Sequence, residues 1–244
     1  TRRSSDLKNT AVATTENFLE VVENESIEKL FTEFNKAYIC GIVEKNLQFS
    51  HETMWDCFYI TRVKVTRLSG TIDFIPIMVS YKLVNDVNAS LEGKWVEIAG
   101  QFRSYNYEGE DGKRHLQLFL FATGINIYDE NQETIESLVE ANMLFLDGYI
   151  CREPVYRTTP LGREITDLLI AINRPYGKSD YIPCIAWGRT AQWASRLEVG
   201  NRVQLYGRIQ SREYKKQGEV RVAYEISILR MKEVKDFQLE QKNK

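Results

Sequence analysis

The sequence predicts an all-β chain in which two copies of one small barrel follow each other. Two observations carry this prediction: an internal repeat at a fixed offset, and short β-rich runs whose side chains alternate in character. At 244 residues, with 43% hydrophobic and 27% charged residues, the chain has a globular composition and the length for two domains of roughly 100 residues each.

The repeat appears at an offset of 107 residues, at which Asp73-Phe74-Ile75-Pro76 recurs as Asp180-Tyr181-Ile182-Pro183. The same offset relates Gly41, Arg67, Gly93, Val96, Gly100, Ser104 and Tyr107 to Gly148, Arg174, Gly200, Val203, Gly207, Ser211 and Tyr214. A chance similarity would drift in register, so the repeat indicates two diverged copies of one domain.

The strands follow from side-chain alternation. From Arg202 to Tyr214, apolar or small residues occupy every second position and basic or aromatic residues lie between them, which is the period of a half-buried strand. Trp95 to Tyr107 repeats this pattern in the first copy. Four further strands are expected in the second copy: Met143–Ile150, Glu164–Asn173, Tyr181–Trp187 and Val220–Met231.

A short helix is expected between the third and fourth of these strands. Ala191, Ala194 and Leu197 recur at helical spacing within Arg189–Leu197. A helix that caps a five-stranded barrel is the arrangement of the OB-fold. We therefore predict two tandem five-stranded OB-fold barrels, preceded by a short acidic helical N-terminal segment.

The domain boundaries follow from the repeat. We expect an acidic helical segment over residues 1–34, a diverged first OB domain over residues 35–130 and a linker over residues 131–141. The second OB domain is expected over residues 142–235, followed by a C-terminal tail over residues 236–244.

Composition and motifs argue against several classes of protein. No apolar run is long enough to span a membrane, and the start of the chain does not look like an export signal. The four cysteines have no C-x-x-C spacing and there are two histidines, so we expect no zinc site and no cofactor. Phosphate-binding-loop, H-E-x-x-H and G-x-S-x-G motifs are absent, so we expect no enzymatic activity.

The net charge of −2 hides an asymmetry between the copies. Residues 142–235 carry 16 Lys and Arg against 10 Asp and Glu, whereas residues 36–130 carry 10 against 12. The basic charge that a nucleic-acid partner requires therefore lies in the second copy.

The second copy resembles the bacterial single-stranded DNA-binding protein family from Asn142 to Val234. The resemblance rests on several dispersed motifs: Leu146-Asp147-Gly148, Glu153-Pro154 with Arg157, Thr159-Pro160-Leu161-Gly162, Leu169 to Arg174, Tyr181 to Gly188, and Gly207 to Tyr214. It implies base stacking on Tyr176, Tyr181, Trp187 and Tyr214, and phosphate contacts from Arg157, Lys178, Arg189 and Arg212.

The first copy departs from this pattern. Ser69 and Ser80 stand where the register places Tyr176 and Trp187, while Phe74 and Tyr107 keep the other two aromatic positions. Arg103 remains beside them as a candidate phosphate contact. We therefore expect weaker binding in the first copy, or a mainly structural role.

Structural explanations compete with these assignments, because aromatic residues also fill small-barrel cores and dimer contacts. Trp55, Trp95 and Trp193 are interpreted as packing residues.

Two other functions stay open: a primosome- or plasmid-type OB protein that mainly scaffolds other proteins, and a pure protein-interaction module. The leading function is the one that the resemblance implies, namely binding of single-stranded DNA by a cytoplasmic, nucleoid-associated bacterial protein. It also implies a homodimer with four OB domains, with replication or repair proteins as possible partners. The acidic and apolar tip that recruits such partners in family members is missing from residues 235–244.

Overall fold

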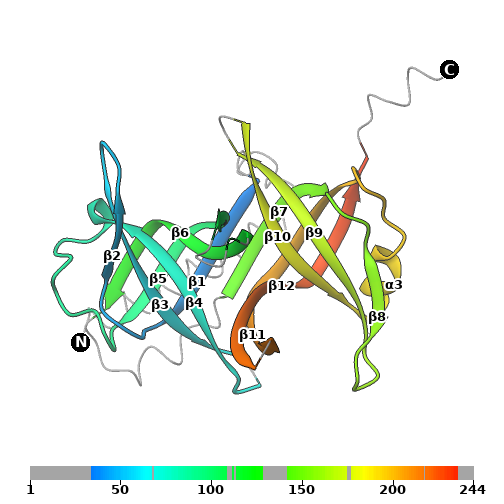
Figure 1. Cartoon of the computed structure of the whole chain (residues 1–244). Coiled ribbons are helices and arrows are strands. Elements are labelled where there is room, and N and C mark those ends of the chain that lie inside the picture. The colour runs from blue at the N-terminus through cyan, green and yellow to red at the C-terminus, as the bar shows by residue number, and fades with distance from the viewer. Residues whose placement is uncertain are drawn as a thin grey trace, which may run out of the picture.

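The computed structural model describes residues 34–235, except residues 68, 109–111, 113, 129–141, 175, 176 and 217. The N-terminal helices expected before residue 34, the linker over residues 131–141 and the tail over residues 236–244 lie outside the described residues. Among the residues that are described, the two barrels lie side by side, as Figure 1 shows.

Each barrel contains the predicted strands and one short strand more. The first barrel consists of β1 (Asn35–Val43), β2 (Gln48–Glu52), β3 (Cys57–Thr66), β4 (Ile72–Ser80), β5 (Trp95–Glu108) and β6 (Arg114–Tyr128). The second consists of β7 (Asn142–Ile150), β8 (Val155–Thr158), β9 (Glu164–Arg174), β10 (Lys178–Trp187), β11 (Arg202–Lys216) and β12 (Glu219–Val234). The additional strands β2 and β8 lie at the two edges of the sheet and are exposed along their whole length.

The fixed offset holds through five strands and then changes. Val96 and Val203 pair with equivalent neighbours on β1 and β7, as the offset of 107 requires. In the last strand, Met78 pairs with Phe121 in the first barrel and Ile185 pairs with Ser227 in the second. Phe121 is therefore equivalent to Ser227 at an offset of 106, so the single spacing expected throughout the repeat is wrong for β6 and β12.

The barrels close where β1 crosses β3 and β7 crosses β9. A Cβ atom on Gly41 would lie 2.3 Å from the Lys64 carbonyl oxygen, and one on Gly148 would lie 2.5 Å from that of Ala171. Only glycine permits these close approaches. Both glycines were found as members of the sequence repeat, and their role is to let each barrel close.

A short helix closes the second barrel, as predicted, although it ends earlier than expected. α3 (Gly188–Ala194) buries Ala191 and Ala194, and the Thr166 hydroxyl donates a hydrogen bond of 2.7 Å to the Ala191 carbonyl. In the first barrel the equivalent position holds only a single 3-10 turn, η2 (Tyr81–Leu83).

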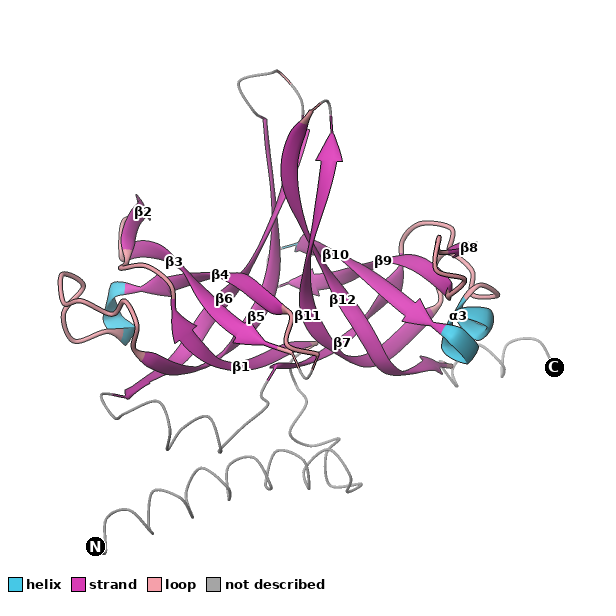
Figure 2. Ribbon diagram, turned by 90° about the horizontal axis from the view of Figure 1, so that it is seen from below, coloured by secondary structure: helices cyan, strands magenta, loops and turns pink. Residues whose placement is uncertain are grey.

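Strands β1 and β7 join the barrels into one twelve-stranded sheet. They pair antiparallel, with Asn35 opposite Leu146 and Ile39 opposite Asn142. The Asn35 side chain bonds the backbone N–H and carbonyl of Phe102, and the Asn142 side chain bonds those of Ile209 in the same way. The two halves are thus related by an approximate twofold symmetry. Figure 2 shows extended hairpins rising from the middle of this arrangement.

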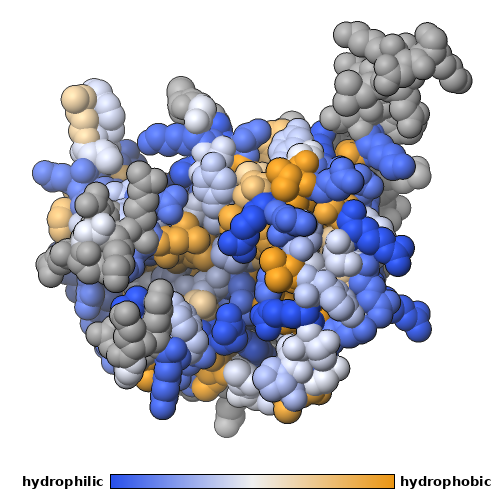
Figure 3. All heavy atoms as spheres, turned by 45° about the vertical axis from the view of Figure 1, so that its right-hand side comes forward, coloured by the Kyte–Doolittle hydropathy of each residue, from blue (hydrophilic) through white to orange (hydrophobic). Residues whose placement is uncertain are grey.

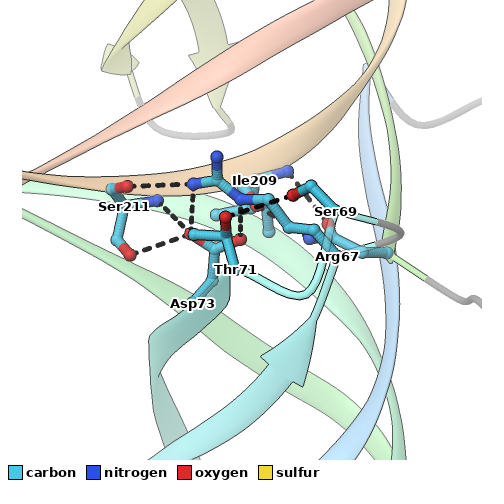
Figure 4. Close-up of polar contacts among 7 residues, drawn as sticks. Arg67, Ser69, Thr71, Asp73, Ile209 and Ser211 are labelled. Carbon is cyan, nitrogen blue, oxygen red and sulfur yellow. Dashed lines mark hydrogen bonds and ion pairs between the residues drawn. The ribbon is translucent and has the colours of Figure 1, made fainter.

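A buried carboxylate links each barrel to the hairpin of the other. Arg67 bonds both oxygens of Asp73, and the Ser211 backbone N–H and hydroxyl donate to Asp73 Oδ1 at 2.6 and 2.8 Å (Figure 4). The Arg67 guanidinium also donates to the Ser211 carbonyl at 3.0 Å. Strand β4 of the first barrel is therefore tied to β11 of the second.

The symmetric contact joins β10 to β5. The Ser104 N–H donates to Asp180 Oδ1 at 2.7 Å, and the Tyr181 N–H donates to the Ser104 hydroxyl at 2.8 Å. Arg174 Nε lies 3.0 Å from Asp180 Oδ2, but the two atoms are not in hydrogen-bonding geometry. Burial raises the pKa of Asp180. The two contacts also differ in hydrogen bonding, because Arg67 donates a hydrogen bond to each oxygen of Asp73.

Candidate nucleic-acid interface

Two of the predicted stacking residues lie on the outer side of β10. Tyr181 and Trp187 alternate with the buried residues Ile182, Cys184 and Ala186, so both point out of the barrel. The Tyr181 side chain is 40% exposed. Trp187 is partly buried, and its indole N–H donates to the Ser227 hydroxyl at 3.0 Å. Tyr181 therefore offers an open ring, and Trp187 a ring that is held in place by β12.

Strand β11 adds a tyrosine and an arginine to this side of the barrel. Tyr214 is 37% exposed and lies opposite Arg221. Arg212 also points outward, and its guanidinium lies 3.6 Å from the carboxylate of Glu225 on β12. Burial raises the pKa of Glu225, and Arg212 lowers it to a smaller extent. We call Tyr181, Trp187, Arg212 and Tyr214 the second-barrel face.

The other predicted cations differ in how they are engaged. Arg157 on β8 forms an ion pair and two hydrogen bonds with Asp167. Lys178 and Arg189 are exposed, and neither forms an ion pair with another described residue. Tyr176, the remaining predicted stacking residue, lies outside the described residues. Figure 3 shows that hydrophilic side chains dominate the side of the second barrel that it presents, with smaller apolar patches between them.

In the first barrel, Tyr107 is as exposed as the stacking tyrosines of the second barrel, whereas Phe74 and Arg103 are partly buried. Phe74 is partly buried, with the Arg62 guanidinium 5.6 Å from its ring centroid and its carbonyl bonded by the Tyr224 hydroxyl. Tyr107 is 41% exposed and stacks between Tyr105 and His115, with centroid separations of 6.2 and 5.4 Å.

Arg103 and the two replacement serines have specific surroundings. The Arg103 guanidinium lies 3.8 Å from the Phe121 ring centroid and donates to Gln101. Burial, and then the charge of Arg174, lower the pKa of Arg103. Ser80 donates to the Asp56 carboxylate, and Ser69 bonds Thr71 (Figure 4).

A groove of about 500 Å³ lies where the second hairpin meets the first barrel. The first barrel contributes Lys45, Arg62 and Tyr107, and the second contributes Val222 and Tyr224. Sequence reasoning placed Tyr107 in a binding face but missed the other lining residues, because they come from both copies and meet only in the folded chain.

The three tryptophans interpreted as packing residues differ in their surroundings. Trp193 packs against the core and Trp95 is partly buried, but Trp55 is 79% exposed in the turn between β2 and β3. The packing interpretation of Trp55 is therefore wrong. Its turn closes through bonds from Thr53 to the Asp56 carbonyl, which leave the indole pointing to solvent.

Two classes of feature are absent from the part of the chain that is described. No helix there is long and apolar enough to cross a membrane. No three His, Cys, Asp or Glu residues there are grouped closely enough to hold a metal ion.

Comparison with known sequences finds a family match in the second barrel. Residues 141–234 match the model of the single-strand binding protein family. The single-stranded DNA-binding protein of Oceanobacillus iheyensis is 35% identical over 83 residues, which are 31% of this chain and 52% of that protein. That of Halalkalibacterium halodurans is 34% identical over 80 residues, which are 30% of this chain and 48% of that protein. The chain thus spans about half the length of these relatives.

Comparison with solved structures extends the likeness to both barrels. The single-stranded DNA-binding protein from Thermus aquaticus superimposes with a TM-score of 0.65 at 18% identity, covering 83% of this chain and 93% of that chain. At this identity the match shows the fold alone, and it confirms the expected all-β OB architecture. The resemblance read from the sequence is thus confirmed: the second barrel matches the single-strand binding protein family over its whole length.

Proposed function

We propose that the chain binds single-stranded DNA without catalysing a reaction and largely without regard to base sequence. It would act in replication, repair or recombination. The observation that carries this proposal is the second-barrel face, where Tyr181 and Tyr214 are exposed and Arg212 lies two residues from Tyr214 on β11, on a barrel whose sequence matches the family. The names of the bacterial relatives point to the same ligand.

Stacking accounts for sequence-independent affinity. Every base has a π-face, and stacking on an aromatic side chain contributes about 1–3 kcal/mol per base. Tyr181 and Tyr214 are open enough to take a base, and the Ser227 hydroxyl fixes the edge of Trp187. Tyr176 is proposed as a fourth stacking residue from the sequence motif.

Cations account for attachment to the backbone. Lys178 and Arg189 are proposed as phosphate contacts that need no rearrangement, since neither is engaged with a described acidic group. Arg157 and Arg212 would exchange Asp167 and Glu225 for phosphate oxygens. In the first barrel, Phe74, Tyr107 and Arg103 are the corresponding proposed contacts.

The proposed assembly is a homodimer that presents four OB domains, because each chain supplies two. Its molar mass in solution, measured by light scattering after gel filtration, tests this directly. A chain that remains monomeric at micromolar concentration would rule the dimer out without affecting the proposal of DNA binding.

The experiment that tests the function is a titration of the full chain with oligo-dT, followed by tryptophan fluorescence at two salt concentrations. We expect quenching, and an affinity that falls with salt by a slope of about −0.7 for each phosphate contact. A duplex of equal length serves as the competitor. Absence of both quenching and salt-sensitive binding would exclude the proposed function.

A further inference from the structure

The first barrel lacks an aromatic residue at one stacking position but carries aromatic rings directly beside it. Ser80 stands at the end of β4, where the second barrel has Trp187 at the end of β10. Phe58 on β3 lies directly opposite Ser80. The Phe121 ring on β6 lies 5.7 Å from that of Phe58, centroid to centroid.

The second barrel shows the converse arrangement at the equivalent place. Ile165 lies opposite Trp187, at the position of Phe58, and Ser227 stands at the position of Phe121. Ser227 accepts the hydrogen bond from the Trp187 indole. The second barrel thus has Trp187 beside Ile165 and Ser227. The first barrel has Ser80 beside Phe58 and Phe121. Aromatic surface is retained at the same place on both barrels but comes from different strands.

Two polar side chains extend the aromatic surface of the first barrel. His51 on β2 is exposed and stacks on Phe58, with ring centroids 5.0 Å apart and planes 20° apart. At the other end, the Arg103 guanidinium lies over Phe121 at 3.8 Å. The order His51, Phe58, Phe121, Arg103 forms a continuous row of planar groups that we call the displaced platform.

The row has the chemistry of a single-strand contact. Planar imidazole, phenyl and guanidinium groups all stack on nucleobases, and the guanidinium adds a positive charge that attracts phosphate. A purely structural cluster would be covered, but His51 is exposed and Phe58, Phe121 and Arg103 are all partly exposed. The Ser80 hydroxyl donates to the Asp56 carboxylate, and its small side chain stands where the second barrel has the Trp187 indole.

We propose that the displaced platform of the first barrel is a second binding site for unstacked bases of single-stranded DNA. This inference rests on the proposed function, and it replaces the expectation that the loss of two aromatic positions makes the first barrel a weak or structural domain. A strand bound on the second-barrel face continues onto the first barrel and stacks there on His51, Phe58 and Phe121.

The test compares two double variants of the full chain, each of which changes one aromatic residue of β3. Phe58→Leu with Phe121→Leu removes the rings of the platform while keeping apolar side chains. Phe49→Leu with Tyr59→Leu is the matched control, because it removes an edge-on aromatic pair from the same β2–β3 hairpin but from outside the platform. Both variants are first checked for an unchanged thermal midpoint. Affinity is then measured by fluorescence anisotropy with an oligo-dT long enough for two barrels.

We expect the platform variant to bind the long oligo-dT about 5-fold or more weakly than the wild type, as loss of one stacked base implies. The control should bind as the wild type does. Wild-type affinity in the platform variant would overturn this inference and leave the proposed function standing. A wild-type chain that binds no oligo-dT would overturn the proposed function itself.

A second measurement covers the case in which the platform variant does not fold. The wild-type chain is photo-crosslinked to an oligo-dT that carries 5-iodouracil, and the crosslinked peptides are identified by mass spectrometry. Crosslinks in β3 or β6 support the platform. Crosslinks confined to residues of the second barrel overturn it.

Discussion

Asp73 of the first barrel accepts two hydrogen bonds from Ser211 of the second barrel. The Ser211 backbone N–H donates at 2.6 Å and the Ser211 hydroxyl donates at 2.8 Å. The Asp73 side chain is fully buried, and Arg67 bonds both of its oxygens. A buried carboxylate that is hydrogen-bonded in this way fixes the position of one barrel against the hairpin of the other. The relative position of the barrels therefore depends on a few specific side chains as well as on β1 and β7.

Replacing Asp73 should strongly destabilise the chain. Asp73→Ala leaves the Arg67 guanidinium partly buried without its carboxylate and removes the acceptor of the Ser211 N–H. Breaking such a pair by deleting one partner typically costs about 3–5 kcal/mol. Urea denaturation followed by circular dichroism measures the loss. A midpoint equal to that of the wild type would show that the contact does not hold the barrels.

The matched control is Ser211→Ala, which deletes only the hydroxyl. The backbone N–H of residue 211 can still donate to Asp73, so we expect a loss of about 1 kcal/mol. Asp180→Ala, at the symmetric position, should destabilise in the same direction as Asp73→Ala, because Asp180 accepts from the Ser104 N–H and lies against Arg174.

The residues of this contact were visible in the sequence, but their role was not. Arg67, Asp73 and Ser104 recur at the offset of 107 as Arg174, Asp180 and Ser211. Alternation and repeat spacing report strands and duplication. They do not report that Ser211 reaches Asp73, because the two residues are separated by 138 positions and lie on different barrels. Paired polar residues preserved in both copies were the signal that could have pointed to a contact between them.

The strands and the helix were predictable where burial is periodic. Strand β11 alternates buried Val203, Leu205 and Ile209 with outward residues, and its prediction is confirmed. Strand β8 was not predicted, since its four residues are all exposed and produce no hydrophobic period. The displaced platform was missed because an offset of 107 makes Phe121 the counterpart of Ile228. In the sheet, Phe121 pairs with Met78 and Ser227 pairs with Ile185, so Ser227 is its structural counterpart.

Removing the open rings of the second barrel should weaken DNA binding. Tyr181→Leu and Tyr214→Leu keep an apolar side chain but lose the stacking surface, so we expect each to cost about 1–3 kcal/mol of binding free energy. Oligo-dT titration with fluorescence anisotropy measures the change. Tyr156→Leu is the control, since Tyr156 is exposed to a similar degree on β8 but bonds Glu164. Equal losses in all three variants would indicate a general effect rather than stacking.

The proposed phosphate contacts should differ in how much each contributes to the salt dependence of DNA affinity. Lys178→Gln and Arg189→Gln should each reduce the slope of log affinity against log salt by about 0.7, because each removes one phosphate contact. Arg157→Gln should reduce it less, since Arg157 must first leave Asp167. Titration at four salt concentrations measures these slopes. A larger change for Arg157→Gln than for Lys178→Gln would contradict the argument.

Glu225 should make DNA binding depend on pH. Burial raises the pKa of Glu225 above its ordinary value, and the charge of Arg212 lowers it by less. As the pH falls through this raised pKa, Glu225 takes up a proton, Arg212 loses its carboxylate partner, and the affinity for oligo-dT should increase. The increase should begin at a higher pH than an ordinary glutamate would give. Glu225→Gln should bind more tightly at neutral pH, by about a few-fold because the released Arg212 charge is largely exposed to solvent, and should lose the pH dependence. Glu213→Gln, on the opposite face of β11, is the control and should keep the wild-type profile. The same pH profile of affinity in the wild type and in Glu225→Gln would exclude this role for Glu225.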